Sequence, residues 1–236
     1  MITNEQNKEI TNYLLSKNLP IDLVLEVKDH MIEQIENMEN VSFEEAFEQV
    51  KLSWKDELKM VFSFRIPLKK ITRFNKRIVK KLENNFSIKA LKLFIPFLLL
   101  SLVLTIYNKE IGENLFFIIY ILISTITFIS LLYYNKICTT INIMRKRNIS
   151  VYQGNSQLFF LGGMYVFAFN LTNFDVRFEK FYKSIYSILN WDLDHISLLP
   201  LLATYIFLFF WLIGLFYFLN YKKTITELKN RINLKL

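Results

Sequence analysis

The sequence predicts an all-α membrane protein, in which a small cytoplasmic helical bundle is followed by a basic amphipathic helix and a four-helix transmembrane domain. Three observations support this fold class. The composition is 53% hydrophobic, and apolar residues gather in four long segments after residue 89. The first 60 residues are acidic and amphipathic, and a dense run of Lys and Arg separates them from the apolar segments. The predicted parts are an acidic three-helix domain (1–62), a basic interfacial helix (63–88), a four-span domain (89–220) and a basic cytoplasmic tail (221–236).

Charge is distributed very unevenly along the chain. Residues 1–60 hold six Lys and Arg against 13 Asp and Glu, whereas residues 61–92 hold ten against one. The formal net charge of +8 therefore arises beside the apolar segments, where a chain meets a membrane, so it gives no reason to expect direct nucleic-acid binding. The single cysteine, Cys138, excludes an intramolecular disulfide framework.

The acidic domain is predicted to form three amphipathic helices. The first ends near Asn18, because Pro20 disfavours helical geometry in the residue before it. The second runs from Ile21 to Met38, and its apolar residues recur every three or four positions, as in a helix with one buried face. Its other face is acidic, and there we expect a cytoplasmic protein partner to bind. The expected partner-contact residues are Glu26, Asp29, Glu33 and Glu36.

The third helix is predicted to begin at Ser42, because Glu45 follows three residues later in a capping-box pattern. One apolar stripe then continues through Phe43, Phe47, Val50, Trp54, Leu58 and Val61. We expect Phe43, Phe47 and Trp54 to fill the centre of the bundle. A core of about 60 residues is marginal, since small domains bury proportionally little surface.

The segment KKITRFNKRIVKKLENNF, which follows Pro67, predicts a helix that lies on the membrane surface. Its thin apolar edge consists of Ile71, Phe74, Ile78 and Leu82. Each basic side chain near an anionic leaflet contributes roughly 1 kcal/mol to binding. The expected lipid-contact residues are Lys69, Lys70, Arg73, Lys76, Arg77, Lys80 and Lys81. A second interpretation is that these charges only fix the orientation of the chain.

Four apolar segments are predicted to span the membrane, since a spanning helix needs about 20 largely apolar residues. They are Ala90–Tyr107, Leu115–Tyr134, Leu158–Phe174 and Ile196–Leu219. The third contains Gly162 and Gly163, which permit close contact with a neighbouring helix. Basic residues dominate the second connecting loop and the tail, so the positive-inside rule places both termini in the cytoplasm. Together with a Lys-, Ile- and Asn-rich composition, this predicts a multi-pass protein of a bacterial cytoplasmic membrane.

Residues with potential for chemistry are few. His30 lies among acidic residues of the second helix, but one His without a second nearby favours packing over metal binding. The cluster of Asp192, Asp194 and His195 could bind a cation, although capping of the last span explains it better. Apart from Lys92 near the start of the first, the predicted spans hold no Asp, Glu, Lys, Arg or His, which argues against a secondary transporter. We expect no catalytic residue, no metal and no cofactor, and therefore no enzyme.

Three stretches carry a resemblance to a known family: NYLLSKNLPIDLVLEVKDHMIEQIE (12–36), SFEEAFEQV (42–50) and SWKDEL (53–58). They resemble the N-terminal domain of HAAS-type bacterial membrane proteins, in a divergent, flavobacterial-style version. Asn40-Val41 replaces the glycine that the family pattern has before the serine. The resemblance implies a signalling role beside a PadR-like regulator and no enzymatic activity.

These observations lead to one hypothesis and one alternative. The first is an integral membrane protein with a regulatory or protein-interaction role, whose acidic domain binds a cytoplasmic partner. The alternative is a small membrane subunit of a transport or channel complex, for which spans rich in Gly and hydroxyl groups are suited. Either protein is able to form oligomers.

Overall fold

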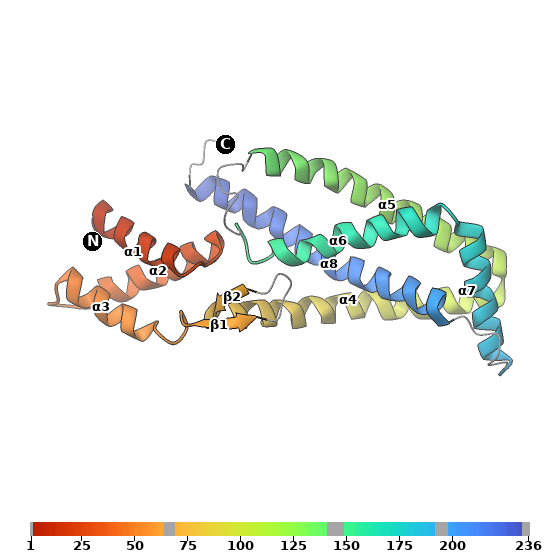
Figure 1. Ribbon diagram of the computed structural model, residues 1–236, viewed down its shortest axis with the longest axis horizontal. Coiled ribbons are helices and arrows are strands. Elements are labelled where there is room, and N and C mark those ends of the chain that lie inside the picture. Colours follow the sequence, from red (N-terminus) through yellow and green to blue (C-terminus); the bar gives the residue numbers. More distant parts are fainter. Residues whose placement is uncertain (1, 64–68, 141–148, 192–197, 233–236) are drawn as a thin grey trace. The chain divides into compact units, whose positions relative to one another are not determined.

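The computed structural model describes residues 2–63, 69–140, 149–191 and 198–232 (Figure 1). These residues are mostly helical, and they divide into two compact units. The first unit comprises residues 1–84, 142–153 and 221–236, and the second comprises residues 85–141 and 154–220. The first unit therefore gathers three stretches that are far apart in the sequence.

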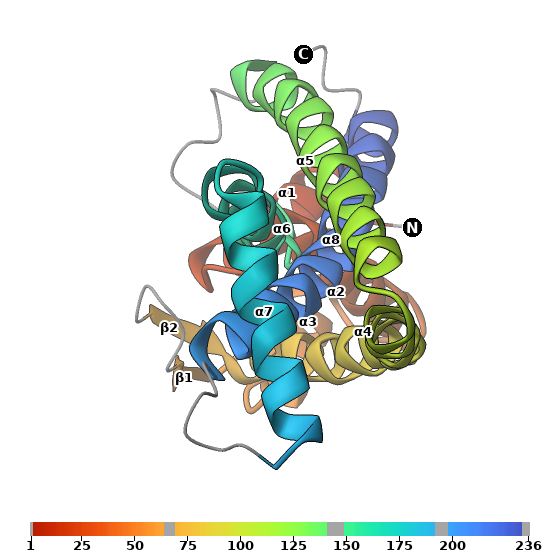
Figure 2. The ribbon, with the colours of Figure 1, turned by 90° about the vertical axis from the view of Figure 1, so that its right-hand side faces the viewer.

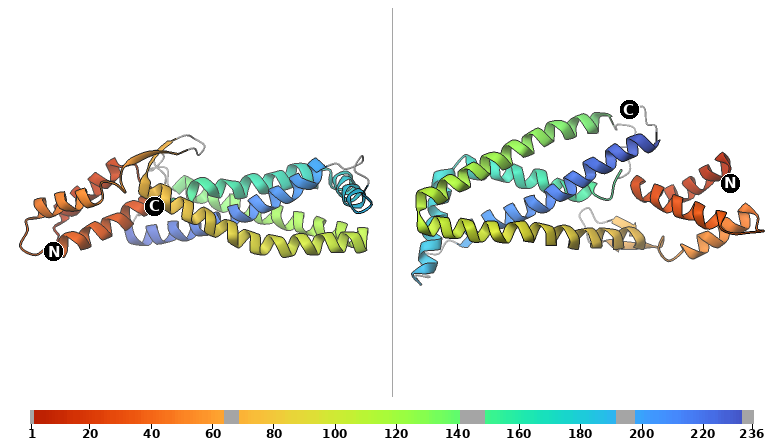
Figure 3. Two further views of the ribbon diagram at one scale, coloured as in Figure 1. Left: turned by 90° about the horizontal axis from the view of Figure 1, so that it is seen from below. Right: turned by 180° about the vertical axis from the view of Figure 1, so that it is seen from behind.

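Three helices of the first unit confirm the predicted amphipathic pattern: α1 (Asn4–Ser16), α2 (Ile21–Glu36) and α3 (Phe43–Ser53). They lie side by side (Figure 3). The predicted cap of α3 is present, because the Ser42 hydroxyl accepts a hydrogen bond from the Glu45 N–H at 3.3 Å. The core of this unit contains the apolar residues of all three helices. Its helical members include Ile10, Leu14, Val24, Val27, Met31, Ile35, Phe47 and Val50.

The end of the third predicted helix is wrong. Helix α3 ends at Ser53, and Val61 belongs to strand β1 (Met60–Ser63), which pairs with β2 (Lys69–Thr72) in an antiparallel hairpin. Phe43 and Trp54 are only partly buried, so Phe47 alone of the three predicted aromatic residues occupies the centre. The apolar spacing continues past the last turn of α3, but in β1 it serves a strand, which suits residues such as Val61 and Phe62.

The predicted bounds of the basic helix, residues 63–88, are also wrong. Residues 69–72 form β2, and helix α4 (Arg73–Tyr107) begins only at Arg73 and continues without interruption into the first predicted span. The Thr72 hydroxyl accepts a hydrogen bond from the Asn75 N–H at 3.2 Å and caps the new helix. Phe74 is buried and Ile78 partly buried in the core of the first unit. Half of the predicted apolar edge is therefore covered by protein rather than lipid.

The second unit contains parts of the long helices α4, α5 (Lys109–Thr140) and α8 (Leu198–Ile232), with α6 (Gln153–Tyr165), the π-helix η2 (Val166–Leu171) and α7 (Phe174–Leu189). Among the described residues, three helices are long and apolar enough to cross a membrane, and they include the first predicted span and most of the second and fourth. The third predicted span is not one uninterrupted α-helix, because α6 passes into η2 at Val166. Helix α7 was not predicted at all, and it lies crosswise at one end of the other helices (Figure 2).

Close packing in the second unit depends on glycine, as predicted for Gly162 and Gly163. A Cβ atom on Gly163 would overlap Thr127 of α5, and one on Gly162 would lie 2.9 Å from the Cβ of Trp211 in α8. The Trp211 indole N–H donates a hydrogen bond to the buried Thr127 hydroxyl at 3.1 Å. These contacts pack α6 directly against both α5 and α8.

Candidate functional site

An open cleft of about 410 Å³ lies in the first unit. Helix α2, the start of α4, the end of α8 and residues 151–152 line it. Four of its lining residues are acidic and one is Arg. Apolar side chains form much of the remaining wall. The charged lining residues are Asp22, Glu26, Asp29, Glu227 and Arg231. An acidic cleft with apolar walls suits a basic, partly apolar partner segment.

Asp22 joins the start of α2 to the residues that precede α6. One carboxylate oxygen, Oδ2, accepts hydrogen bonds from the Ser150 hydroxyl at 2.7 Å and from the Val151 N–H at 2.9 Å. The Asp22 N–H in turn donates to the Ile149 carbonyl at 3.2 Å. We call these three contacts the Asp22 clasp. It connects segments that are 128 residues apart in the sequence.

The electrostatics of the clasp are set mainly by burial. Burial raises the pKa of Asp22, and the negative charge of Glu26 adds to this, while the hydrogen bonds from Ser150 and Val151 oppose it. Burial also raises the pKa of Tyr152, as do the acidic groups around the cleft. Ionised Asp22 is thus held at a cost in desolvation, and the clasp depends on its hydrogen bonds more than on its charge.

The end of α8 completes the cleft. Ile225 and Leu228 are buried in the first unit, and the Arg231 guanidinium lies 3.5 Å from the Asp29 carboxylate. Both charged side chains are exposed, so their pairing contributes only about 0–1 kcal/mol. The C-terminal helix therefore lies beside the acidic face of α2 through a weak, exchangeable ion pair.

The four residues predicted to contact a partner are all exposed, but they have different neighbours. Glu26 and Asp29 line the cleft. Glu33 lies 3.8 Å from His30, and Glu36 accepts a hydrogen bond from the Ile2 N–H at 3.3 Å. Within the described residues, no group of three or more His, Cys, Asp and Glu side chains is placed to hold a metal ion.

The basic residues predicted to contact lipid lie at the hairpin and along the first turns of α4. Six are exposed, whereas the side chain of Lys69 lies outside the described residues. Two are tied to the first unit. Arg77 pairs with Glu57 at 2.9 Å, and the Lys76 ammonium donates to the Phe62 carbonyl at 3.5 Å. The exposed remainder are Lys70, Arg73, Lys80 and Lys81.

One predicted cluster cannot be placed, and two residues of the cleft were not predicted. The cluster Asp192, Asp194 and His195 lies outside the described residues. The sequence interpretation missed Asp22 and Arg231, the residues that tie α2 to residues 149–151 and to α8. Asp22 follows Pro20 at the start of a helix, where an acidic residue is ordinary, so only the fold indicates its further role.

Replacing Asp22 by alanine is expected to open the clasp. The Val151 N–H loses its acceptor, and loss of a hydrogen bond to a charged group costs about 1.5–3 kcal/mol, so hydrogen exchange at Val151 should accelerate about tenfold or more. Asp22→Asn retains an oxygen acceptor and avoids burying a charge, so its exchange should stay near that of the unaltered protein. Mass-resolved exchange in nanodiscs measures both, with the exposed residue Asp56→Ala as control. Equal acceleration in Asp22→Asn and Asp22→Ala would contradict this account.

The clasp should also respond to pH. Because the pKa of Asp22 is raised in the clasped state, protons bind more tightly there than in an open state with an ordinary carboxyl. Clasped-state stability is therefore gained as the pH falls through the raised pKa toward the ordinary carboxyl pKa, and it is lost as the pH rises back through the raised pKa. Exchange at Val151, corrected for its intrinsic pH dependence, should slow on acidification, and this dependence should vanish in Asp22→Asn.

No protein-family model, curated protein or solved structure matches the chain.

Proposed function

We propose that the chain is a four-span protein of a bacterial cytoplasmic membrane whose first unit binds a cytoplasmic protein partner in a regulatory role. One observation carries the proposal. The first unit gathers the N-terminal helices, residues 149–153 and the end of α8, and the Asp22 clasp and the Arg231–Asp29 pair join them. Apolar helices separate these three stretches in the sequence, so the unit constrains how the chain crosses a membrane.

The composition of the first unit implies an even number of membrane crossings between its three stretches. Stretches that pack in one compact unit lie on one side of a bilayer, so the chain between them crosses an even number of times. Helices α4 and α5 provide two crossings before residue 149. Between residue 153 and the end of α8, the α8 crossing needs a companion, and α6 with η2 is the apolar segment available. Three crossings alone would place the end of α8 on the wrong side.

The combined helix of α6 and η2 has properties that suit a crossing. Its apolar stretch, Leu158–Leu171, rises about 21 Å at 1.5 Å per residue, and the polar residues before it extend the helix to about 28 Å, near the ~30 Å hydrocarbon core. Leu161, Met164 and Phe167 are exposed along one side. The glycine side packs on α5 and α8. A π-helical segment is tolerated in a membrane when its backbone groups remain bonded within the protein.

The regulatory role is supported by exchangeable contacts between acidic and basic segments. The Arg77–Glu57 and Arg231–Asp29 pairs are at least partly exposed, so a basic partner can replace either one at little cost. Such a partner would meet Glu26 and Asp29 in the cleft and Glu33 and Glu36 beyond it. Charge complementarity of this kind sets specificity and association rate more than affinity. The resemblance to HAAS-type proteins makes PadR-like regulators the first class of partner to test.

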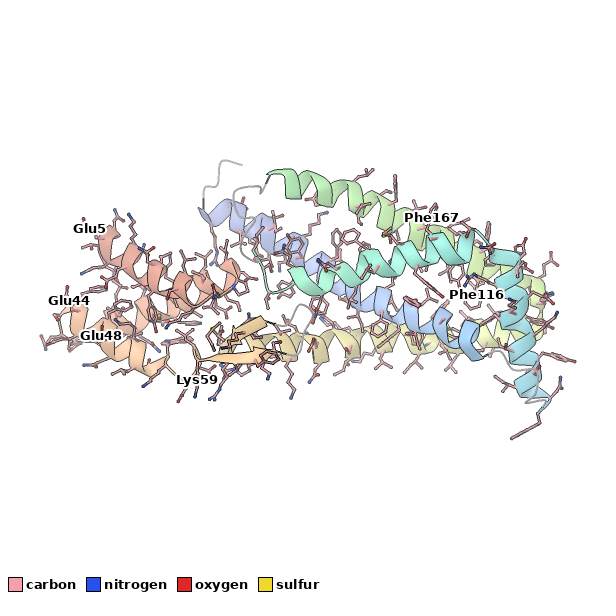
Figure 4. The ribbon with its side chains drawn as sticks, in the orientation of Figure 1. Glu5, Glu44, Glu48, Lys59, Phe116 and Phe167 are labelled. Carbon is pink, nitrogen blue, oxygen red and sulfur yellow. The ribbon has the colours of Figure 1, made fainter. Side chains whose placement is uncertain are left out.

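Neutralising the acidic face of α2 is expected to weaken partner binding. The variant Glu26→Gln, Asp29→Asn, Glu33→Gln and Glu36→Gln should reduce affinity for the purified regulator about tenfold at low salt, with a smaller effect at high salt. A control neutralises three acidic residues of α1 and α3 that do not line the cleft, Glu5, Glu44 and Glu48 (Figure 4). Binding measured in nanodiscs that is equal in the two variants would contradict the proposal. Copurification of a stoichiometric multi-span companion instead would favour the role of a complex subunit.

A further inference from the structure

Helix α7 has one apolar face, and most of this face is buried in the second unit. The Phe116 ring of α5, labelled in Figure 4, lies 5.9 Å from the Phe178 ring and 5.0 Å from the Phe181 ring. The Phe174 ring lies 5.1 Å from the Phe117 ring, and the Phe181 ring lies 5.7 Å from the Tyr205 ring of α8. The first three turns of α7 are thus fixed on the ends of α5 and α8.

The same apolar face continues beyond the protein that covers it. Ile188 and Leu189 follow the buried Ile185 by three and four residues, so they lie on the same side of the helix. Yet Ile188 is 43% exposed, Leu189 is 50% exposed, and Trp191, just after the helix, is 86% exposed. The last turn of α7 therefore presents an uncovered apolar cluster, which we call the α7 anchor: Ile188, Leu189 and Trp191.

The position of α7 indicates what covers the anchor. The helix lies crosswise to α4, α5 and α8 at the end where α4 and α5 meet (Figure 1, Figure 2). Lys109, the first residue of α5, forms an ion pair with Glu179 and lies 5.2 Å from the centre of the Tyr182 ring. If α4 and α5 span the bilayer, this end is at a membrane surface, and a helix crosswise to them lies in the plane of that surface.

The direction of the apolar face follows from the same geometry. Phe174, Phe178 and Phe181 point toward the spanning helices, so the uncovered turn points toward the bilayer around them. The opposite face is polar and of mixed charge, with Glu179, Lys180 and Lys183. Amphipathic helices in this orientation bury their apolar side about 5–10 Å into the boundary between headgroups and acyl chains. Trp is favoured at that depth, because its ring is apolar and its N–H is polar.

We propose that α7 is an interfacial helix whose anchor inserts into the lipid headgroup boundary at the α4–α5 end of the spans. Under the proposed topology this is the outer leaflet. The inference rests on the proposed membrane topology but not on any protein partner. Exposed apolar residues of α4, such as Leu99 and Val103, continue the lipid-facing surface from the spans to this level. Lipid is therefore the occupant that the surroundings of the anchor already require.

Fluorescence of Trp191 tests this inference directly. The protein has three Trp residues, and Trp54→Phe with Trp211→Phe leaves Trp191 as the only one. In vesicles of phosphatidylcholine brominated near the headgroup end of its chains, Trp191 should lose about half of its emission, because bromine quenches indole on contact and the ring is held at that depth. Aqueous acrylamide should quench it weakly. Strong acrylamide quenching without quenching by brominated lipid would overturn the inference.

Two matched variants in a background with all three Trp residues replaced by Phe complete the test. Leu99→Trp places an indole on the exposed side of α4 and reports whether the spans themselves meet lipid. Val176→Trp places one on the outward face of α7, and only acrylamide should quench it. Lipid quenching of Leu99→Trp but not of Trp191 overturns the α7 anchor alone, and protection of Trp191 from both quenchers means that protein covers it. Absence of lipid quenching at both Leu99→Trp and Trp191 overturns the membrane topology as well.

Discussion

Replacing Gly214 with leucine is expected to disrupt the packing of the second unit. A Cβ atom at Gly214 would overlap the backbone nitrogen of Phe159, so α6 and α8 cannot remain in contact. Backbone cannot move aside as the end of a flexible side chain can. Overpacking of a tight interface costs about 1–3 kcal/mol and sometimes more, and here the added side chain meets backbone, so we expect about 3 kcal/mol or more.

The measurement is the midpoint of denaturant- or heat-induced unfolding in detergent micelles, followed by the fluorescence of Trp211 in a background with Trp54→Phe and Trp191→Phe. Gly154→Leu is the matched control, because a Cβ atom at Gly154 meets no neighbouring atom within 4 Å and the residue lies in the first turn of α6. Its midpoint should stay close to that of the unaltered protein. If Gly214→Leu is as stable as Gly154→Leu, then α6 does not pack on α8 and the second unit is described incorrectly.

Replacing Phe47 with alanine is expected to unfold the first unit. The ring is 3% exposed, stacks on Phe43 at 5.5 Å and meets Tyr13 edge-on at 5.8 Å. A buried Phe→Ala change costs about 3–5 kcal/mol, which approaches the whole stability of a small domain. The second unit lies outside this core, so its helices should persist.

Limited proteolysis of the protein in nanodiscs distinguishes these outcomes. Cleavage within residues 2–63 should become rapid in Phe47→Ala, while fragments from the second unit remain protected. Phe62→Ala is the control, because Phe62 of β1 is 49% exposed and its loss should cost well below 1 kcal/mol. Equal protection of the first unit in both variants would mean that Phe47 does not hold its core together.

Local patterns in the sequence predicted much of this fold. The three- and four-residue spacing of Val24, Val27, Met31 and Ile35 identified the buried face of α2, because residues with that spacing lie on the same side of a helix. At Trp54, Leu58 and Val61 the same spacing continued beyond the end of α3, and there it misled. Phe174, Phe178, Phe181 and Ile185 also recur at three- and four-residue steps, but the sequence interpretation treated this segment as a loop between spans and missed α7.

Other features could not be predicted from local pattern. The partner of Asp22 lies 128 residues away, and neither residue carries a signal of the pairing. The change from α6 to η2 at Val166 is also absent from the hydrophobic pattern, since both helix types place apolar residues on one side. Phe74 and Ile78 have the spacing of a lipid-facing edge and of a core-facing edge alike. Which surface they meet depends on the β1–β2 hairpin, which brings them against α2 and α3.

The central claim is that the first unit lies on one side of a membrane that the chain crosses four times. Single cysteines, introduced after Cys138→Ser, can be labelled in intact cells by a thiol reagent that does not cross membranes. Tyr107→Cys and Asn190→Cys should be labelled. Glu39→Cys, Gly154→Cys and Asn230→Cys should react only after the membrane is permeabilised. Labelling of Asn230→Cys in intact cells, with Glu39→Cys still protected, would show an odd number of crossings and contradict the account.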